Sequence, residues 1–154
     1  MGASSDIEAA LGSTASGHSK QGHLSPVCLS LPARPESVAE ARHAVAHLGE
    51  QLGYSETRLH DLRTVVSEAC MNAAVHAYQD PGGRFDLWAV PNGLGMRITV
   101  SDQGSGIKPR PSFDSPTARL GVLLIAALAS SVEISSRSGG GTNLRIEFNS
   151  AQRH

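Results

Sequence analysis

Three side chains able to do chemistry are spaced four residues apart in the middle of the chain. Glu68, Asn72 and His76 would stack along one side of a helix, beside its apolar face. Asn72 offers an oxygen of the kind that Mg²⁺ binds together with phosphates and water. Glu68 can orient a water molecule or take a proton from an attacking hydroxyl. The spacing alone also fits a structural role, such as a carboxylate that caps a helix or pairs with an arginine.

A second group is the segment Asp102-Gln103-Gly104-Ser105-Gly106, which directly follows an apolar run. A carboxylate at a strand end can accept a hydrogen bond from an exocyclic amine, such as that of adenine. Gly104 and Gly106 carry no Cβ, so the backbone there can approach a flat ring or a phosphate. By itself the segment also fits a simple Asp-x-Gly turn, which is common.

Two further segments contain groups that suit a phosphate or a base. Arg119 and Gly121 stand at the start of an apolar helix, whose free amides and dipole attract phosphate. Arg119 can add a charge-assisted contact or remain a surface arginine. The run 139–142 enters the last strand, and it either brings the Thr142 hydroxyl beside the base or forms a flexible hairpin.

The elements that position these groups follow from apolar periodicity and turn residues. We expect strands at 27–31, 84–90, 96–100, 132–136 and 142–148, and helices at 35–52, 55–78 and 120–129. The Asn92-Gly93 pair predicts a hairpin. The helix at 120–129 is so apolar that we expect it to be buried. Separate runs of helices and strands predict an α+β fold: a two-layer sandwich with helices on one face of a mixed, mostly antiparallel sheet.

Length and composition fit one globular domain of 154 residues, 40% hydrophobic and 18% charged. We expect a flexible N-terminal tail at 1–25, a domain at 26–150 and a short tail at 151–154. The net charge of −1 argues against non-specific nucleic-acid binding. The chain shows no signal peptide and no apolar run near the roughly 20 residues needed to span a bilayer, so we expect a cytoplasmic protein without membrane contact. Cys28 and Cys70 are expected to be small buried apolar residues.

Together these segments resemble the GHKL ATPase superfamily with its Bergerat nucleotide-binding fold, and above all the bacterial anti-sigma-factor serine/threonine kinases. Residues 68–78, Glu-Ala-Cys-Met-Asn-Ala-Ala-Val-His-Ala-Tyr, resemble their N-box. Residues 102–106 resemble their Asp-x-Gly-x-Gly box, 121–125 the end of their second glycine box, and 140–142 their last box. The likeness covers about 27–149, and the eleven-residue N-box is its most specific part.

The resemblance implies a role for each site residue. Asn72 would bind Mg²⁺, Glu68 would be the catalytic base, and Asp102 would bind the adenine amine with Thr142 beside it. The segment 107–118 would form a lid over the phosphates. The full set expected to bind the nucleotide is Asn72, His76, Asp102, Gly104, Gly106, Arg119, Gly121 and Thr142. ATP and Mg²⁺ are the implied cofactors.

The implied activity is transfer of the ATP γ-phosphoryl group to a serine or threonine of a STAS-type anti-sigma-factor antagonist, combined with binding of a sigma factor. A homodimer is common in the family. Arg119 stands where the family has the first glycine of its second box, and the family's Asp shortly after that box is missing, since Ser130 follows Ala129. These departures keep an alternative open: a nucleotide-gated binding module without kinase activity.

Overall fold

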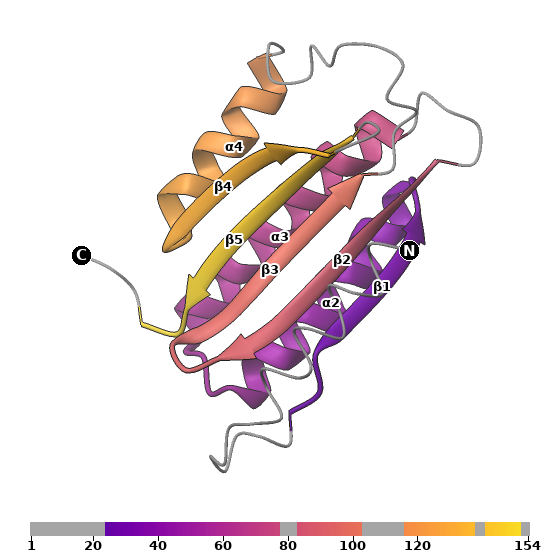
Figure 1. Ribbon diagram of the computed structural model, residues 1–154. Helices are drawn as coiled ribbons and strands as arrows, with labels where there is room; N and C mark the ends of the chain where they lie inside the picture. Colours follow the sequence, from indigo (N-terminus) through magenta and orange to yellow (C-terminus); the bar gives the residue numbers. More distant parts are fainter. Residues whose placement is uncertain (1–23, 78–82, 103–115, 138–140, 152–154) are drawn as a thin grey trace.

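The computed structural model describes residues 24–77, 83–102, 116–137 and 141–151. Its elements are β1 (Val27–Pro32), α2 (Pro35–Gln51), α3 (Glu56–Ala77), β2 (Arg84–Asn92), β3 (Gly95–Asp102), α4 (Pro116–Leu128), β4 (Ser131–Ser136) and β5 (Thr142–Asn149). Figure 1 shows two layers, with α2 and α3 lying across one face of the sheet. The predicted two-layer α+β sandwich is confirmed.

The sheet has five described strands in the order β1-β2-β3-β5-β4. All four pairings are antiparallel, where the sequence had suggested a mixed sheet. On β3, Met96, Ile98 and Val100 are buried, whereas Arg97 between them is exposed. This alternation puts one face of the sheet against the helices. The antiparallel pairing of β3 with β5 places the end of β3 beside the start of β5, at the same end of the sheet.

The core lies between α2, α3 and the helix-facing side of the sheet. The apolar stripe predicted for α2 is buried at Val38, Ala41, Val45 and Leu48. The stripe predicted for α3 is buried at Leu59, Leu62, Val66, Ala69 and Ala73. A fully buried Leu or Val side chain contributes roughly 1.5–3 kcal/mol, so these stripes hold α3 firmly along the sheet.

Local signals set where α3 begins and how β2 turns into β3. The Ser55 Oγ accepts a hydrogen bond from the Arg58 amide at 3.1 Å, as expected of an N-cap. At the predicted hairpin, Asn92 Oδ1 accepts bonds from the Leu94 and Gly95 amides at 3.0 and 2.9 Å. The hairpin register places Asp102 opposite Phe85 at the far end of the ladder.

The expected burial of α4 was wrong. Gly121 and Ile125 are buried, but Leu120 and Leu123 keep 67% and 65% of their surface exposed. The reason is the position of α4 at the edge of the helical layer, where it packs against α3 and lies beside the edge strand β4 (Figure 1). For this helix, apolar composition therefore did not predict burial of its side chains.

The two cysteines also differ from the prediction. Cys70 is buried in α3, and burial raises the pKa of its thiol to about 12. Cys28 is exposed, because it lies on the sheet face that carries no helix, in register with Trp88. A small side chain on a strand follows whichever face its register gives it.

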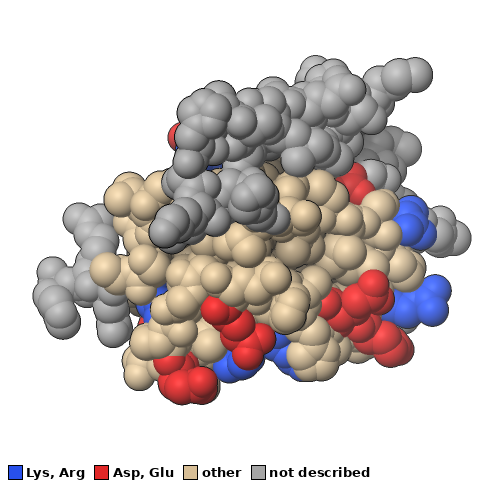
Figure 2. All heavy atoms as spheres, turned by 90° about the horizontal axis from the view of Figure 1, so that it is seen from below, with Lys and Arg blue, Asp and Glu red and all other residues tan. Residues whose placement is uncertain are grey.

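No helix in the described part of the chain is long and apolar enough to cross a membrane. On the face seen in Figure 2, acidic and basic side chains lie next to one another along one side, beside a broad uncharged area. The expected N-terminal tail lies outside the described residues except for Leu24 and Ser25, and it stays a prediction together with the domain limits.

Candidate functional site

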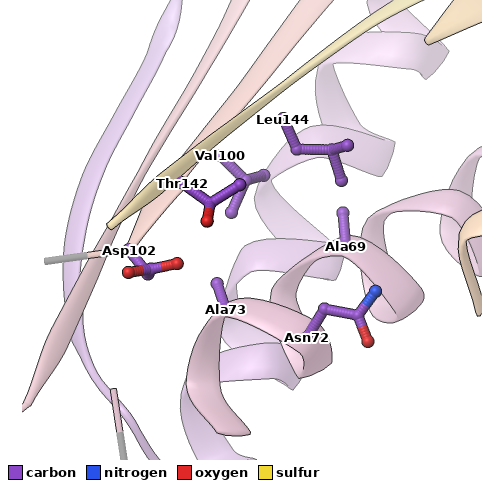
Figure 3. A pocket seen from close by; sticks show the side chains of 7 residues that line it. All are labelled: Ala69, Asn72, Ala73, Val100, Asp102, Thr142 and Leu144. Carbon is purple, nitrogen blue, oxygen red and sulfur yellow. The ribbon is translucent and has the colours of Figure 1, made fainter. Parts of the chain in front are cut away.

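A pocket opens between α3 and the strand ends of β3 and β5. About 280 Å³ of space there is free of protein atoms, and part of this space is open solvent. Its walls come from Ala69, Asn72, Ala73, Val100, Asp102, Thr142 and Leu144. Figure 3 shows Asp102 and Thr142 beside each other at the strand ends, with α3 opposite them. The pocket thus combines apolar walls with a few polar groups.

Asp102 is held at the rim by the neck of the β4–β5 hairpin. Its side chain and backbone together are only 2% exposed. Arg137 Nη1 donates to the Asp102 carbonyl at 3.2 Å, and the Arg137 amide donates to the Gly141 carbonyl at 3.0 Å. Gly141 has φ +94°, and a Cβ there would lie 2.5 Å from the Asp102 carbonyl oxygen. Only glycine allows this approach, so the hairpin neck sets the position of the carboxylate.

Asn72 lies across the pocket on α3. In Figure 3 its amide is directed away from Asp102. Its Nδ2 atom is buried and has no hydrogen-bond partner within the described part of the chain. Such an orphaned polar atom costs about 1–3 kcal/mol, which a ligand can offset. A flip of the side-chain amide exchanges the positions of its oxygen and nitrogen. After such a flip, Asn72 can present its oxygen to a cation.

Glu68 lies one helical turn before Asn72 and is partly exposed. Both side chains lie against the middle of α4: a Cβ built on Gly121 would lie 2.9 Å from Glu68 Oε2 and 3.5 Å from Asn72 Nδ2. The expectation that Gly121 stands at the start of this helix was wrong, because α4 begins at Pro116. Glu68, Asn72 and Gly121 therefore form one group beside the pocket. Asp102 and Thr142 form a second group at the opposite side, as a base and a phosphate chain would require.

Several expected site residues cannot be placed in this geometry. Gly104 and Gly106 lie outside the described residues, as does most of the expected lid at 107–118. His76 and Arg119 belong to α3 and α4, but the positions of their side chains are outside what the structure describes. Their roles stay predictions.

The apolar walls of the pocket and its hairpin neck were not predicted from the sequence. Ala69 and Ala73 were assigned to the core face of α3, and only their small size next to the Glu68–Asn72 pair hinted that they leave room for a ring. Val100 and Leu144 read as ordinary strand residues. No local signal pointed to Arg137, because its contact with Asp102 spans 35 residues of sequence.

Comparison with known proteins matches residues 31–148 to the histidine kinase-like ATPase domain family. The serine-protein kinase RsbW of Halalkalibacterium halodurans is 32% identical over 124 residues, covering 72% of this chain and 76% of that protein. The anti-sigma F factor of Clostridium acetobutylicum is 28% identical over 125 residues, covering 75% and 87%.

Among solved structures, the RsbU and RsbW domains of Rv1364c from Mycobacterium tuberculosis superimpose with a TM-score of 0.56 at 20% identity. The match covers 84% of this chain but only 33% of that longer protein, and it supports the fold alone. The chain belongs to the histidine kinase-like ATPase domain family. Within it, the predicted likeness to the anti-sigma-factor kinases is confirmed, and the chain is a nucleotide-binding protein of that kind.

Proposed function

We propose that this chain is an ATP-dependent serine/threonine kinase that phosphorylates a STAS-type anti-sigma-factor antagonist and also binds and silences a sigma factor. The proposal extends the kinase and anti-sigma factor names of its relatives to this chain. It places the reaction in the cytoplasm, where sigma factors act. A homodimer stays a prediction.

The observation that carries the proposal is the division of the pocket into two polar sides. Asp102, backed by the hairpin neck, faces the pocket as an acceptor for the adenine amine, with the Thr142 hydroxyl next to it. Asn72 and Glu68 lie on the α3 side, next to Gly121 in the middle of α4. A nucleotide spanning the pocket would carry its base on the first side and its phosphates toward the second.

In the proposed reaction each residue has one task. The oxygen of the acceptor hydroxyl attacks the γ-phosphorus, and the bond from that phosphorus to the bridging oxygen breaks, with its electrons leaving on ADP. The hydroxyl proton passes to the Glu68 carboxylate. Asn72 would hold Mg²⁺, which, when bound, neutralises the charge on the phosphate oxygens. Positioning and charge neutralisation supply most of the catalysis in such reactions.

The first test is Mg-ATP binding by titration calorimetry for the wild type, Asp102→Asn and Asn72→Ala. We expect both variants to bind more weakly, because one loses the acceptor for the amine and the other the metal ligand. Glu133→Gln and Gln51→Ala are control variants, since both residues are exposed and lie outside the pocket. Equal binding by all five proteins would contradict this site.

The second test is transfer of label from γ-labelled ATP to a purified STAS-type antagonist. Glu68→Ala should bind ATP normally and transfer label about 10²–10⁴-fold more slowly, the usual effect of losing a general base. A wild type that binds ATP, changes its affinity for the antagonist when it does so, and transfers no label would instead be the nucleotide-gated binding module.

A further inference from the structure

The middle of α4 approaches Glu68 closely at Gly121, the sixth of the thirteen residues of this helix. A Cβ built there would lie 2.9 Å from Glu68 Oε2, closer than real Cβ contacts come. The same Cβ would lie 3.5 and 3.6 Å from the two amide atoms of Asn72, which is ordinary van der Waals contact. An alanine Cβ at this position would therefore push the end of the Glu68 side chain aside, while it would meet Asn72 only in ordinary contact.

Backbone conformation does not explain a glycine at this position. Among the described glycines the positive φ angles belong to Gly53, Gly95 and Gly141, so Gly121 has a helical backbone that any residue can adopt. A glycine inside a helix makes that helix less stable than an alanine would. Among contacts within the described protein, the close approach to Glu68 accounts for the missing Cβ.

We propose that Gly121 is a positioning residue for phosphoryl transfer, because its missing Cβ lets the α4 backbone lie against the Glu68 carboxylate and set its direction. The inference rests on the proposed role of Glu68 as the base. A base must lie within about 2.6–3.2 Å of the group whose proton it takes. A displacement near 1 Å can slow such a reaction about 10²-fold.

This role differs from lining the nucleotide, which the resemblance alone implies for Gly121. A residue that lines the nucleotide changes ATP affinity when it is replaced. A residue that directs Glu68 changes the rate of transfer and leaves ATP affinity nearly unchanged, because Asn72 and the distant Asp102 keep their positions.

The first experiment compares Gly121→Ala with Gly93→Ala, whose added Cβ meets no atom within 4 Å. With γ-labelled ATP and a purified STAS-type antagonist, Gly121→Ala should lower kcat by up to about 10²-fold and change the KM for ATP less than about twofold. Gly93→Ala should match the wild type. A Gly121→Ala variant that keeps kcat, or that loses ATP affinity instead, would overturn the inference.

The second experiment asks whether the effect passes through Glu68. In a Glu68→Ala background, adding Gly121→Ala should slow the residual transfer no further, because the displaced carboxylate is already gone. An equal fold-loss in both backgrounds would show an independent effect and would contradict the inference.

A ligand-free readout separates this inference from the proposed function. The carboxyl ¹³C NMR signal of Glu68 should move in Gly121→Ala and stay in place in Gly93→Ala. An unmoved signal would overturn the contact between Gly121 and Glu68 whatever the kinase assay gives. If the signal moves in Gly121→Ala but the wild-type protein transfers no label, the proposed function is rejected, and the catalytic role of Gly121 with it.

Discussion

The two ends of the domain differ in how their side chains are arranged, although α3, α4 and β5 each run from one end to the other. At the closed end, Tyr54, Arg58 and Phe148 join the first turn of α3 to the ends of α4 and β5. At the pocket end, Asn72, Asp102 and Thr142 surround free space. Arg58 and Asn72 lie on one helix, about 21 Å apart at 1.5 Å per residue.

At the closed end the buried Arg58 cation has its partners within the protein, although the buried Asp61 Oδ2 there has only the ion pair with Arg58 and no hydrogen bond to a described atom. Arg58 is 3% exposed, and it donates to the carbonyl oxygens of Asn149 at 2.9 Å and Leu128 at 2.7 Å. Its guanidinium also lies 3.7 Å from the centre of the Phe148 ring, and the Tyr54 hydroxyl donates to the Phe148 carbonyl at 2.6 Å. The Arg58 cation lies at the Leu128 carbonyl, where it also interacts favourably with the negative end of the α4 dipole.

The pocket end leaves polar groups facing space that a ligand can fill. The buried Asn72 Nδ2 has no partner among the described atoms, and it lies beside the free space of the pocket. The contrast indicates that one end of α4 is anchored by Arg58 while its middle lies against the site. Stability and ligand binding should therefore respond to different mutations.

The largest expected effect is loss of stability in Arg58→Ala. The change leaves the buried Asp61 carboxylate, 3.5 Å from Arg58, without its cation and removes the donors to two backbone carbonyls. We expect the free energy of unfolding in urea to fall by about 3–5 kcal/mol. Mg-ATP affinity of the folded fraction should not change. Arg58→Lys should recover part of the loss, because a lysine keeps the charge but not the forked donors.

Asp102→Asn should show the opposite pattern. We expect Mg-ATP binding to weaken by roughly 1.5–3 kcal/mol, about 10–150-fold, because an amide presents its NH₂ group where the adenine amine needs an acceptor. Calorimetry measures the binding, and urea unfolding should give a smaller change than in Arg58→Ala. If stability fell as far as it does in Arg58→Ala, the division between the two ends would not hold.

Cys70, buried in α3 between the two ends, should make stability depend on pH in the alkaline range. Burial raises the pKa of its thiol from 9.0 to about 12, so the folded protein keeps a proton that the unfolded chain releases. This contribution is complete below pH 9 and is lost as pH rises toward 12, by up to about 1.4 kcal/mol per pH unit. Unfolding from pH 8 to 11 should show a shallower decline for Cys70→Ala than for the wild type. Parallel curves would remove Cys70 as the cause.

The smallest expected effect is that of Tyr54→Phe at the closed end. The variant keeps the ring stacked on Phe148, with centroids 5.9 Å apart, but loses the hydroxyl that donates to the Phe148 carbonyl. We expect a loss of about 1 kcal/mol in unfolding free energy and unchanged ATP binding. A larger loss than in Arg58→Ala would mean that the tyrosine, not the arginine, holds this end together.

Local sequence signals predicted most of the elements and the order of the site segments. Apolar periodicity placed α2 and α3, Ser55 marked the start of α3, and Asn92-Gly93 marked the hairpin. Four-residue spacing put Glu68 and Asn72 on one side of a helix. What failed was everything that depended on distant neighbours: the exposure of α4 and Cys28, and the Arg137 contact with Asp102.

By itself, the sequence determined the family, the helix that carries Glu68 and Asn72, and the carboxylate that follows β3, because these depend on short-range spacing and specific motifs. The family resemblance also implied that Thr142 lies beside Asp102. Only the tertiary structure decided that Gly121 meets Glu68 and that Arg137 contacts Asp102. Antiparallel register brought Asp102 beside Thr142, and packing of α4 on α3 brought Gly121 against Glu68. Such contacts depend on how layers pack at close range, which no local pattern encodes.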